Sequence, residues 1–182
     1  MDTWVPLLLA AGHDVQVFDG VRLGVADDYE SLSIKTKALC QWALETGYGR
    51  MLKLDDDANI RLARFEAVSW DYAGIRMPGH DGWPHAYASG GAYWLSEAGL
   101  RIVAGHTPYD WGEDRWVGKL MAEAGRSLQE ISSYVIWNAE DARFSVRQGK
   151  VDENSAVVTQ LSTDGQSDIE NMLACHRQWG RT

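Results

Sequence analysis

The sequence has 182 residues, of which 45% are hydrophobic and 24% charged, a balance typical of one globular domain with a real core. The net charge of -9 argues against a large sequence-independent nucleic-acid surface, which would need clustered Lys and Arg. The apolar stretch 5–11 is too short for a membrane span and no basic region precedes it, so we expect a cytoplasmic protein without a span. Cys40 and Cys175 make no disulfide framework.

Helical and strand patterns alternate along the chain. Apolar periodicity and turn residues predict helices at 4–11, at 32 to about 46, at 60–68, from 96 onward and at 113 to about 124, and strands at 14–18, 50–54, 72–76 and 134–137. This alternation predicts an α/β fold with a largely parallel sheet. Residues 1–182 contain no repeat or linker, so we expect a single domain.

The strand at 50–54 ends in three carboxylates, Asp55, Asp56 and Asp57. Adjacent carboxylates repel one another, so a hard divalent metal with oxygen ligands is the natural occupant. In open α/β sheets, ligands collect at the carboxyl ends of strands. A metal there can bridge the phosphates of a nucleotide-sugar and neutralise the departing diphosphate. The alternative is a solvated turn that caps the next helix, and the triplet alone supports both equally.

Aromatic residues near Gly and acidic positions are a second indication. The chain has nine Trp residues, and several lie near Gly and acidic positions rather than inside apolar runs, namely Trp83, Trp94, Trp111 and Trp116. Sugar-handling sites favour aromatic rings, because a ring can pack on the apolar face of a pyranose. Core packing explains most of the nine equally well.

Four segments follow one another in a distinctive order: DYESLSIKT at 28–36, KLDDD at 53–57, SGGAYWLS at 89–96 and EDRWVG at 113–118. In order and spacing they resemble the β-1,3-galactosyltransferase and fringe-type family of GT-A glycosyltransferases. That family shows "D-x-Y-x-N-L-T-x-K-T", "K-x-D-D-D", "G-x-G/A-Y-x-x-S" and "E-D-V-x-x-G". The resemblance covers roughly residues 3–120, and four motifs in order are more specific than any one of them. It implies a GT-A, Rossmann-like fold whose mostly parallel sheet is flanked by helices.

The resemblance also implies an inverting transfer of a sugar from a UDP-sugar to an acceptor hydroxyl. Asp57 would be the direct ligand of Mn²⁺ or Mg²⁺, with Asp55 near the metal and ribose and Asp56 acting through water. Asp114 would be the general base, with Glu113 as second choice, since a carboxylate near a desolvated sugar gains a higher pKa. The further residues implied in donor or substrate binding are Lys35, Ser89, Gly90, Gly91, Tyr93 and Trp94.

Each of these roles has a plainer structural explanation. Glu113 and Asp114 also suit a helix N-terminus, where the macrodipole favours negative charge. Gly90 and Gly91 would let a ligand approach the backbone closely, or they form an ordinary turn. Lys35 would help hold the donor, or it is a solvated lysine on a helix.

The sequence departs from the family pattern at two places. The family has a strand and an Arg-rich segment before a Thr-Trp pair, whereas the matching Thr3-Trp4 pair here almost directly follows Met1. Either the true start lies upstream, or the fold manages without this first strand. The family also has a late His metal ligand. Leu161 occupies the corresponding stretch here, and His176 is the nearest candidate, although its surroundings predict a helix.

The acceptor is not specified by the sequence, and a glycan, a protein or a hydroxylated base of modified phage DNA are all open. The chain looks more like bacterial or phage proteins than like Golgi enzymes. One alternative function is a metal-dependent phosphohydrolase, which would need a second cluster of His and Asp ligands that we do not find. The other is a degenerate protein that binds a nucleotide-sugar or glycan without turnover.

Overall fold

The computed structural model describes residues 5–55, 58–60, 70–80, 82–109, 112–131 and 157–158. The chain divides into two compact units. The larger unit consists of Val17–Leu54 and Val68–Ile131, and the smaller unit of Met1–Gln16, Asp55–Ala67 and Ser132–Thr182. Each unit is described by itself below.

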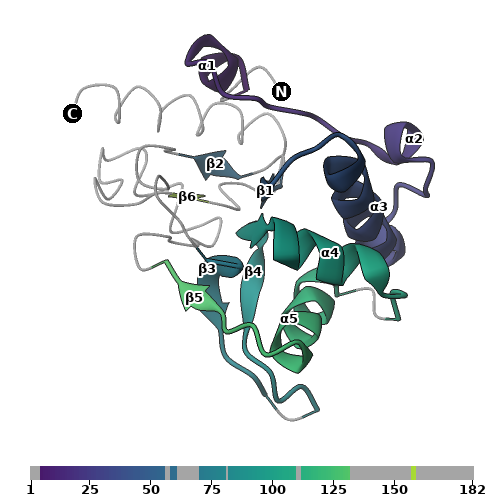
Figure 1. The fold of residues 1–182 in the computed structure, drawn as a ribbon, viewed down its shortest axis with the longest axis vertical. Coiled ribbons are helices and arrows are strands. Elements are labelled where there is room, and N and C mark those ends of the chain that lie inside the picture. The colour runs from purple at the N-terminus through teal and green to yellow at the C-terminus, as the bar shows by residue number, and fades with distance from the viewer. Residues whose placement is uncertain are drawn as a thin grey trace. The chain divides into compact units, whose positions relative to one another are not determined.

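The larger unit is built on a four-stranded sheet in the order β1-β4-β3-β5 (Figure 1). Its strands are β1 (Arg50–Leu54), β3 (Tyr72–Met77), β4 (Tyr87–Ser96) and β5 (Gln129–Glu130). The central strand β4 pairs antiparallel with both β1 and β3, and β5 pairs parallel with β3. In the β1–β4 register Lys53 faces Tyr93.

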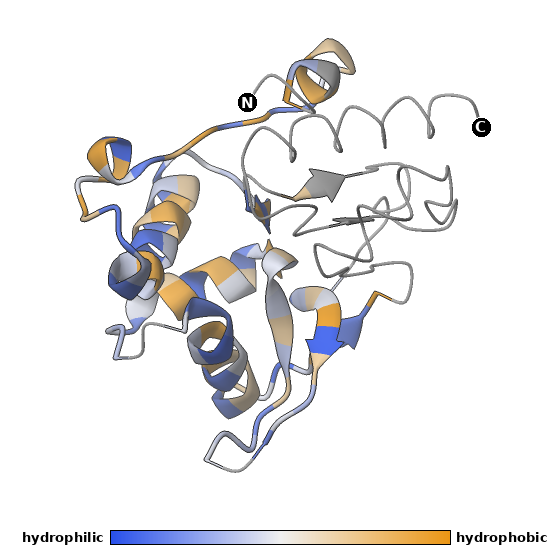
Figure 2. Cartoon of the chain, turned by 180° about the vertical axis from the view of Figure 1, so that it is seen from behind, coloured by the Kyte–Doolittle hydropathy of each residue, from blue (hydrophilic) through white to orange (hydrophobic). Residues whose placement is uncertain are grey.

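Helices α3 (Leu32–Glu45), α4 (Glu97–Gly105) and α5 (Glu113–Glu123) complete the core of this unit. Helices α4 and α5 pack on β4, and α3 packs on both helices. Hydrophobic and hydrophilic residues alternate along all three helices, as expected for helices with one face on a core (Figure 2). The largest fully buried side chains in this core are Trp116, Tyr72, Tyr93, Leu95, Leu100 and Met121.

Two short helical segments precede α3. These are α2 (Gly20–Leu23) and the 3-10 turn η1 (Tyr29–Ser31). Asp19 caps α2 and Asp28 caps η1, each accepting a hydrogen bond from a backbone N–H three residues on. Asp27–Ser31 therefore supplies the start signal for the helical region, as the sequence predicted, and the long helix itself begins at Leu32.

The described part of the smaller unit contains helix α1 (Val5–Ala10) and two short strands, β2 (Asn59–Ile60) and β6 (Val157–Val158). The two strands pair antiparallel. Among the described residues, no helix combines the length and the hydrophobicity that a bilayer crossing requires.

The α/β class is confirmed, but the described sheet is mostly antiparallel, whereas the sequence predicted a mostly parallel one. The reason lies in the connections. The loop at 78–86 joins β3 to β4 without a crossover helix, so β4 must run back along β3. Only the longer path from β4 through α4 and α5 returns the chain parallel to β3, at β5. Alternation of helices and strands does not specify which strands become neighbours.

Most predicted elements in the described residues are confirmed, including α1, α3, β1, β3, α4 and α5. The predicted strand at 14–18 is wrong, because no described strand pairs with this segment. Its last residue, Phe18, instead packs edge-on against Trp42 of α3, with ring centroids 4.6 Å apart. Ile60 lies in β2 rather than at a helix start, and 61–68 and 134–137 lie outside the described residues.

Candidate functional site

A buried ion pair joins strand β1 to the start of helix α5. Nζ of Lys53 lies 2.9 Å from Oε1 of Glu113, and these side chains are 12% and 5% exposed. The same Nζ donates a hydrogen bond of 2.6 Å to the carbonyl of Gly90 in β4. A buried charge is tolerated when it is paired and hydrogen-bonded, and both conditions are met here. One ammonium group therefore links three elements.

The second oxygen of Glu113 is held by a tyrosine. The hydroxyl of Tyr93 donates to Oε2 of Glu113 at 2.9 Å, and Tyr93 is fully buried. Burial first, and then the negative charge of Glu113, raise the pKa of Tyr93 well above its ordinary value, so the phenol stays protonated and can donate. Both carboxylate oxygens of Glu113 are thus engaged inside the fold.

The neighbouring carboxylate, Asp114, has a different environment. It is half-buried, and its Oδ2 accepts from the backbone N–H of Gly90 at 3.2 Å. Its Oδ1 accepts from the N–H of Arg115 at 2.8 Å. Burial raises the pKa of Asp114 above its ordinary value, although these two hydrogen bonds and the charge of Lys53 oppose the rise. Asp114 is therefore a hydrogen-bonded, partly accessible carboxylate with a raised pKa.

Gly90 is the point at which strand β4 passes both acids. A Cβ added to Gly90 would lie 3.1 Å from Oε1 of Glu113 and 3.5 Å from the Asp114 side chain. A side chain at this position would push against two carboxylates that are already hydrogen-bonded. Close approach of a ligand to Gly90 stays a prediction; in the structure Gly90 lies within strand β4, not in a turn, and the groups close to it are these two acids.

The other predicted substrate residues in β4 lie in varied environments. Ser89 is buried, whereas Gly91 and Trp94 are half-buried. The guanidinium of Arg50 lies 5.9 Å from the centre of the Trp94 ring. The ammonium group of Lys35 in α3 forms its ion pair with Asp27, eight residues earlier, and not with an acid of this cluster.

The predicted metal site is described only in part. Asp55 directly follows β1, and its carbonyl accepts a hydrogen bond from the N–H of Ala58 at 3.1 Å, as in a turn. Asp56, Asp57 and His176 lie outside the described residues. Within the described ranges, no three His, Cys, Asp or Glu side chains come together to hold a metal ion. The donor chemistry of the triplet, three adjacent carboxylates, suits Mn²⁺ or Mg²⁺.

Two participants in this cluster had no role assigned from the sequence. Lys53 was part of the KLDDD motif only, although a lysine between leucines in a strand is itself a sign of a buried charge that needs a partner. Cys40 of α3 is fully buried, and burial followed by the charge of Glu113 raises the pKa of its thiol. A lone cysteine in a helix gave no comparable sign.

Comparison with known proteins adds no family. No family model matches the sequence, and no curated protein matches it. The functional argument therefore depends on the motifs and on the geometry of the larger unit.

Proposed function

We propose that the chain is an inverting, metal-dependent glycosyltransferase that moves a sugar from a UDP-sugar to an acceptor hydroxyl. The observation that carries this proposal is the meeting of three motifs. Lys53 of KLDDD, Gly90 and Tyr93 of SGGAYWLS, and Glu113 with Asp114 of EDRWVG form one hydrogen-bonded cluster. These motifs are dozens of residues apart in sequence, so chance proximity to the same two acids is a weak explanation.

The two acids divide the work in this proposal. Lys53 neutralises the charge of Glu113, and Tyr93 donates a hydrogen bond to it. Glu113 therefore has a structural role next to Asp114. Asp114 takes the proton from the acceptor hydroxyl as the oxygen attacks the anomeric carbon. The new glycosidic C–O bond forms while the bond from that carbon to the UDP oxygen breaks, with inversion. A raised pKa suits a general base, because the carboxylate then holds the proton more strongly.

Asp57, with Asp55, would hold Mn²⁺ or Mg²⁺, which when bound neutralises the departing diphosphate. In sequence these acids directly follow β1, the strand that carries Lys53. The GT-A arrangement is part of this proposal and is supported by the α/β class of the larger unit. The donor sugar and the acceptor, whether glycan, protein or hydroxylated DNA base, stay open within it.

The first experiment is a calorimetric titration of UDP with and without Mn²⁺, on wild type, Asp57→Ala and Asp14→Ala. Asp14 is an exposed acid outside the motifs and serves as the matched control. We expect metal-dependent binding in wild type and control and its loss in Asp57→Ala. No UDP binding by folded wild type would overturn the proposal, and binding without any hydrolysis or transfer would support the degenerate binder instead.

The second experiment tests the base. Asp114→Asn should lower kcat for transfer by about 10²–10⁴-fold. In wild type the rate should rise with pH as Asp114 loses its proton, with a midpoint above the ordinary Asp value of 3.8, and this rise should vanish in the variant. UDP binding should be unchanged, which separates loss of the base from loss of the donor site. Full transfer activity in the folded variant would contradict the assignment.

A further inference from the structure

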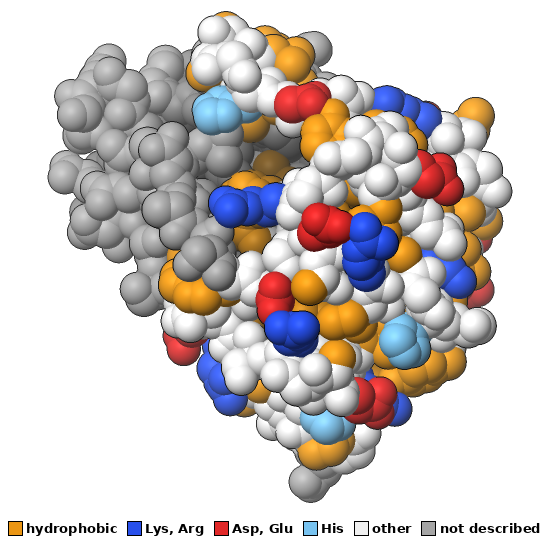
Figure 3. Space-filling model, in the orientation of Figure 1, with side chains coloured by type: hydrophobic (Ala, Val, Ile, Leu, Met, Phe, Trp, Pro, Cys, Tyr) orange, Lys and Arg blue, Asp and Glu red, His pale blue; other side chains and the backbone are white. Residues whose placement is uncertain are grey.

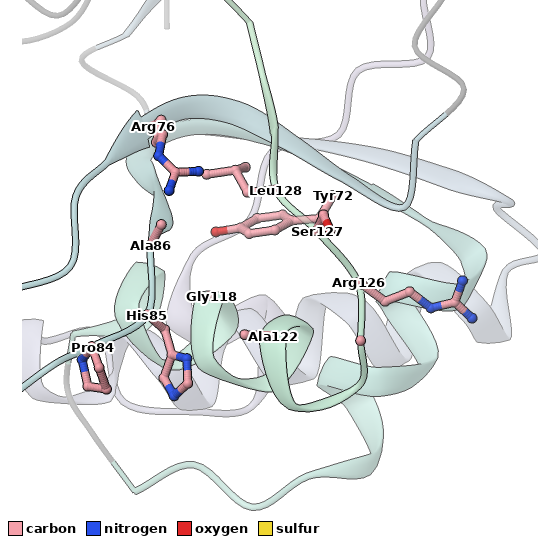
Figure 4. Close-up of a pocket in the computed structure, with 11 residues that line it drawn as sticks. Tyr72, Arg76, Pro84, His85, Ala86, Gly118, Ala122, Arg126, Ser127 and Leu128 are labelled. Atoms are coloured by element: carbon pink, nitrogen blue, oxygen red, sulfur yellow. The ribbon is translucent and has the colours of Figure 1, made fainter.

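A hollow of about 400 Å³ lies in the larger unit between β3, the residues just before β4, the second half of α5 and the segment that follows α5 (Figure 4). Its floor includes Tyr72, whose ring is fully buried and whose hydroxyl accepts a hydrogen bond of 2.6 Å from the N–H of Ala88. Leu128 and Ala122 add apolar surface. The hollow is of the size that small-molecule ligands occupy in proteins.

Among the described residues that line this hollow, the basic side chains are Arg76, His85 and Arg126, and none of the lining residues is a carboxylate. The chain as a whole has 26 acidic residues against 17 Lys and Arg, and acidic and basic side chains are interspersed over the described surface in Figure 3. The absence of carboxylates from the described part of the lining is therefore a local departure from the character of the chain. It favours an anionic occupant.

The three basic groups differ in what else they contact. Arg126 pairs with Asp71, at 2.6 Å, and points away from the hollow in Figure 4. Arg76 is exposed, and no described residue forms an ion pair with it. In Figure 4 Arg76 and His85 lie on either side of Ala86. These two side chains are available to a ligand without breaking an ion pair within the larger unit.

Helix α5 carries both a residue that lines the hollow and the candidate base. Gly118, which lines it, lies four residues after Asp114, and residues at this spacing share one side of a helix, about 6 Å apart along its axis. Tyr87 packs against Gly118, where an added Cβ would lie 2.3 Å from the Cβ of Tyr87. Burial and then the charge of Asp114 raise the pKa of Tyr87, so its phenol lies within the field of that carboxylate.

We infer that the hollow binds the anionic group, a phosphate or a carboxylate, of a saccharide acceptor, held by Arg76 and His85. A sugar ring that extends from this group along α5 spans the one turn to Asp114, where its hydroxyl would be activated. The acceptor role rests on the proposed glycosyltransferase function, whereas the binding itself does not. Arginine is the side chain best suited to grip phosphate or carboxylate with two parallel hydrogen bonds.

Binding is tested by titrating glucose 6-phosphate, glucuronate and glucose into wild type, Arg76→Gln, Arg76→Lys and Arg101→Gln. Arg101 is an exposed arginine of α4, paired with Glu97, and serves as the control. We expect one or both anionic sugars to bind better than glucose, and Arg76→Gln to weaken that binding about tenfold or more. Arg76→Lys should recover part of the loss, and Arg101→Gln should match wild type.

Equal binding of glucose and the anionic sugars, or equal loss in Arg76→Gln and Arg101→Gln, would overturn the inference. So would binding of a single-stranded oligonucleotide that depends on Arg76 without any binding of the anionic sugars. Because Asp114→Asn leaves the hollow intact, it should bind the anionic sugar with wild-type affinity. If it does while wild type fails to bind UDP, the glycosyltransferase proposal fails and the anion site stands.

Discussion

Two of the lysine–carboxylate pairs in the larger unit involve motif lysines, and these two differ in burial and in the sequence distance that they span. Lys53 and Glu113 are 12% and 5% exposed, and their pair joins a strand to a helix far along the chain. Lys35 and Asp27 are 22% and 53% exposed, and their pair joins residues eight positions apart. Lys53 lies in the KLDDD motif and Lys35 in DYESLSIKT. The two motif lysines therefore have different physical meanings.

This difference in burial indicates which motif residues stabilise the candidate site. An exposed pair exchanges water for a weak attraction, and salt screens it further. The two groups of a buried pair have already lost their hydration, so removal of one partner leaves the other charge buried and unpaired. Lys53 also holds the Gly90 carbonyl, next to the N–H that Asp114 accepts from, so its loss reaches the candidate base. Among the described residues, Lys35 pairs with Asp27 and makes no comparable contact with the cluster.

The largest expected effect comes from Lys53→Met. It leaves the Glu113 carboxylate buried without its cation, which should lower the free energy of unfolding by about 3–5 kcal/mol. Urea denaturation at neutral pH measures the change. The double variant Lys53→Met/Glu113→Gln should recover part of the loss, because no buried charge is then left. A loss below about 1 kcal/mol in the single variant would show that Glu113 is hydrated and that the contrast between the pairs is wrong.

A smaller effect is expected from Tyr93→Phe, which removes the hydroxyl that donates to Glu113 while keeping the ring in the core. Loss of a hydrogen bond to a charged group should lower the free energy of unfolding by about 1.5–3 kcal/mol. Tyr29→Phe, at a tyrosine that is 67% exposed, is the matched control and should change stability little.

The Tyr93→Phe variant also tests whether Tyr93 stabilises the fold or contacts the donor. The sequence resemblance implied that Tyr93 contacts the donor, whereas the structure buries it completely under the cluster. We therefore expect the folded Tyr93→Phe protein to bind UDP with wild-type affinity. A selective loss of UDP affinity, with stability unchanged, would return Tyr93 to the donor site.

The sequence predicted the elements that bear the site because their signals are local. The apolar periodicity of α3, the strand before Asp55 and the acidic start of α5 can all be read without knowing the fold. The direction of β4 depends on the loop at 78–86, whose path is not encoded in a periodicity. The sequence also did not predict which face of the sheet each side chain of β4 lies on. Gly90, Gly91 and the register shift between Gly74 and Arg76 break the simple alternation of side chains between the two faces.

The sequence motifs likewise did not predict the hollow that is proposed to bind an anion. Its basic residues come from β3, from the segment before β4 and from the segment after α5, and none of them belongs to the four motifs. Only packing of α5 against the sheet brings them together. Arg76 in particular belongs to none of these motifs. Its neighbours in the fold give it a more specific meaning than its position in the chain.

The smallest expected effect is that of Lys35→Met, and its pH dependence tests the exposed half of the comparison. The hydrogen bond from Lys35 lowers the pKa of Asp27 below its ordinary value of 3.8. A lowered carboxylate pKa adds stability above that value, and this contribution is lost as pH falls through the folded-state pKa. The melting temperatures of variant and wild type should therefore differ slightly at pH 7 and converge in acid. Added salt should shrink the difference at pH 7 as well, because both groups face solvent. A large loss of melting temperature at pH 7 that salt does not reduce would mean that Lys35 forms a buried ion pair, as Lys53 does. The DYESLSIKT motif would then belong to the cluster.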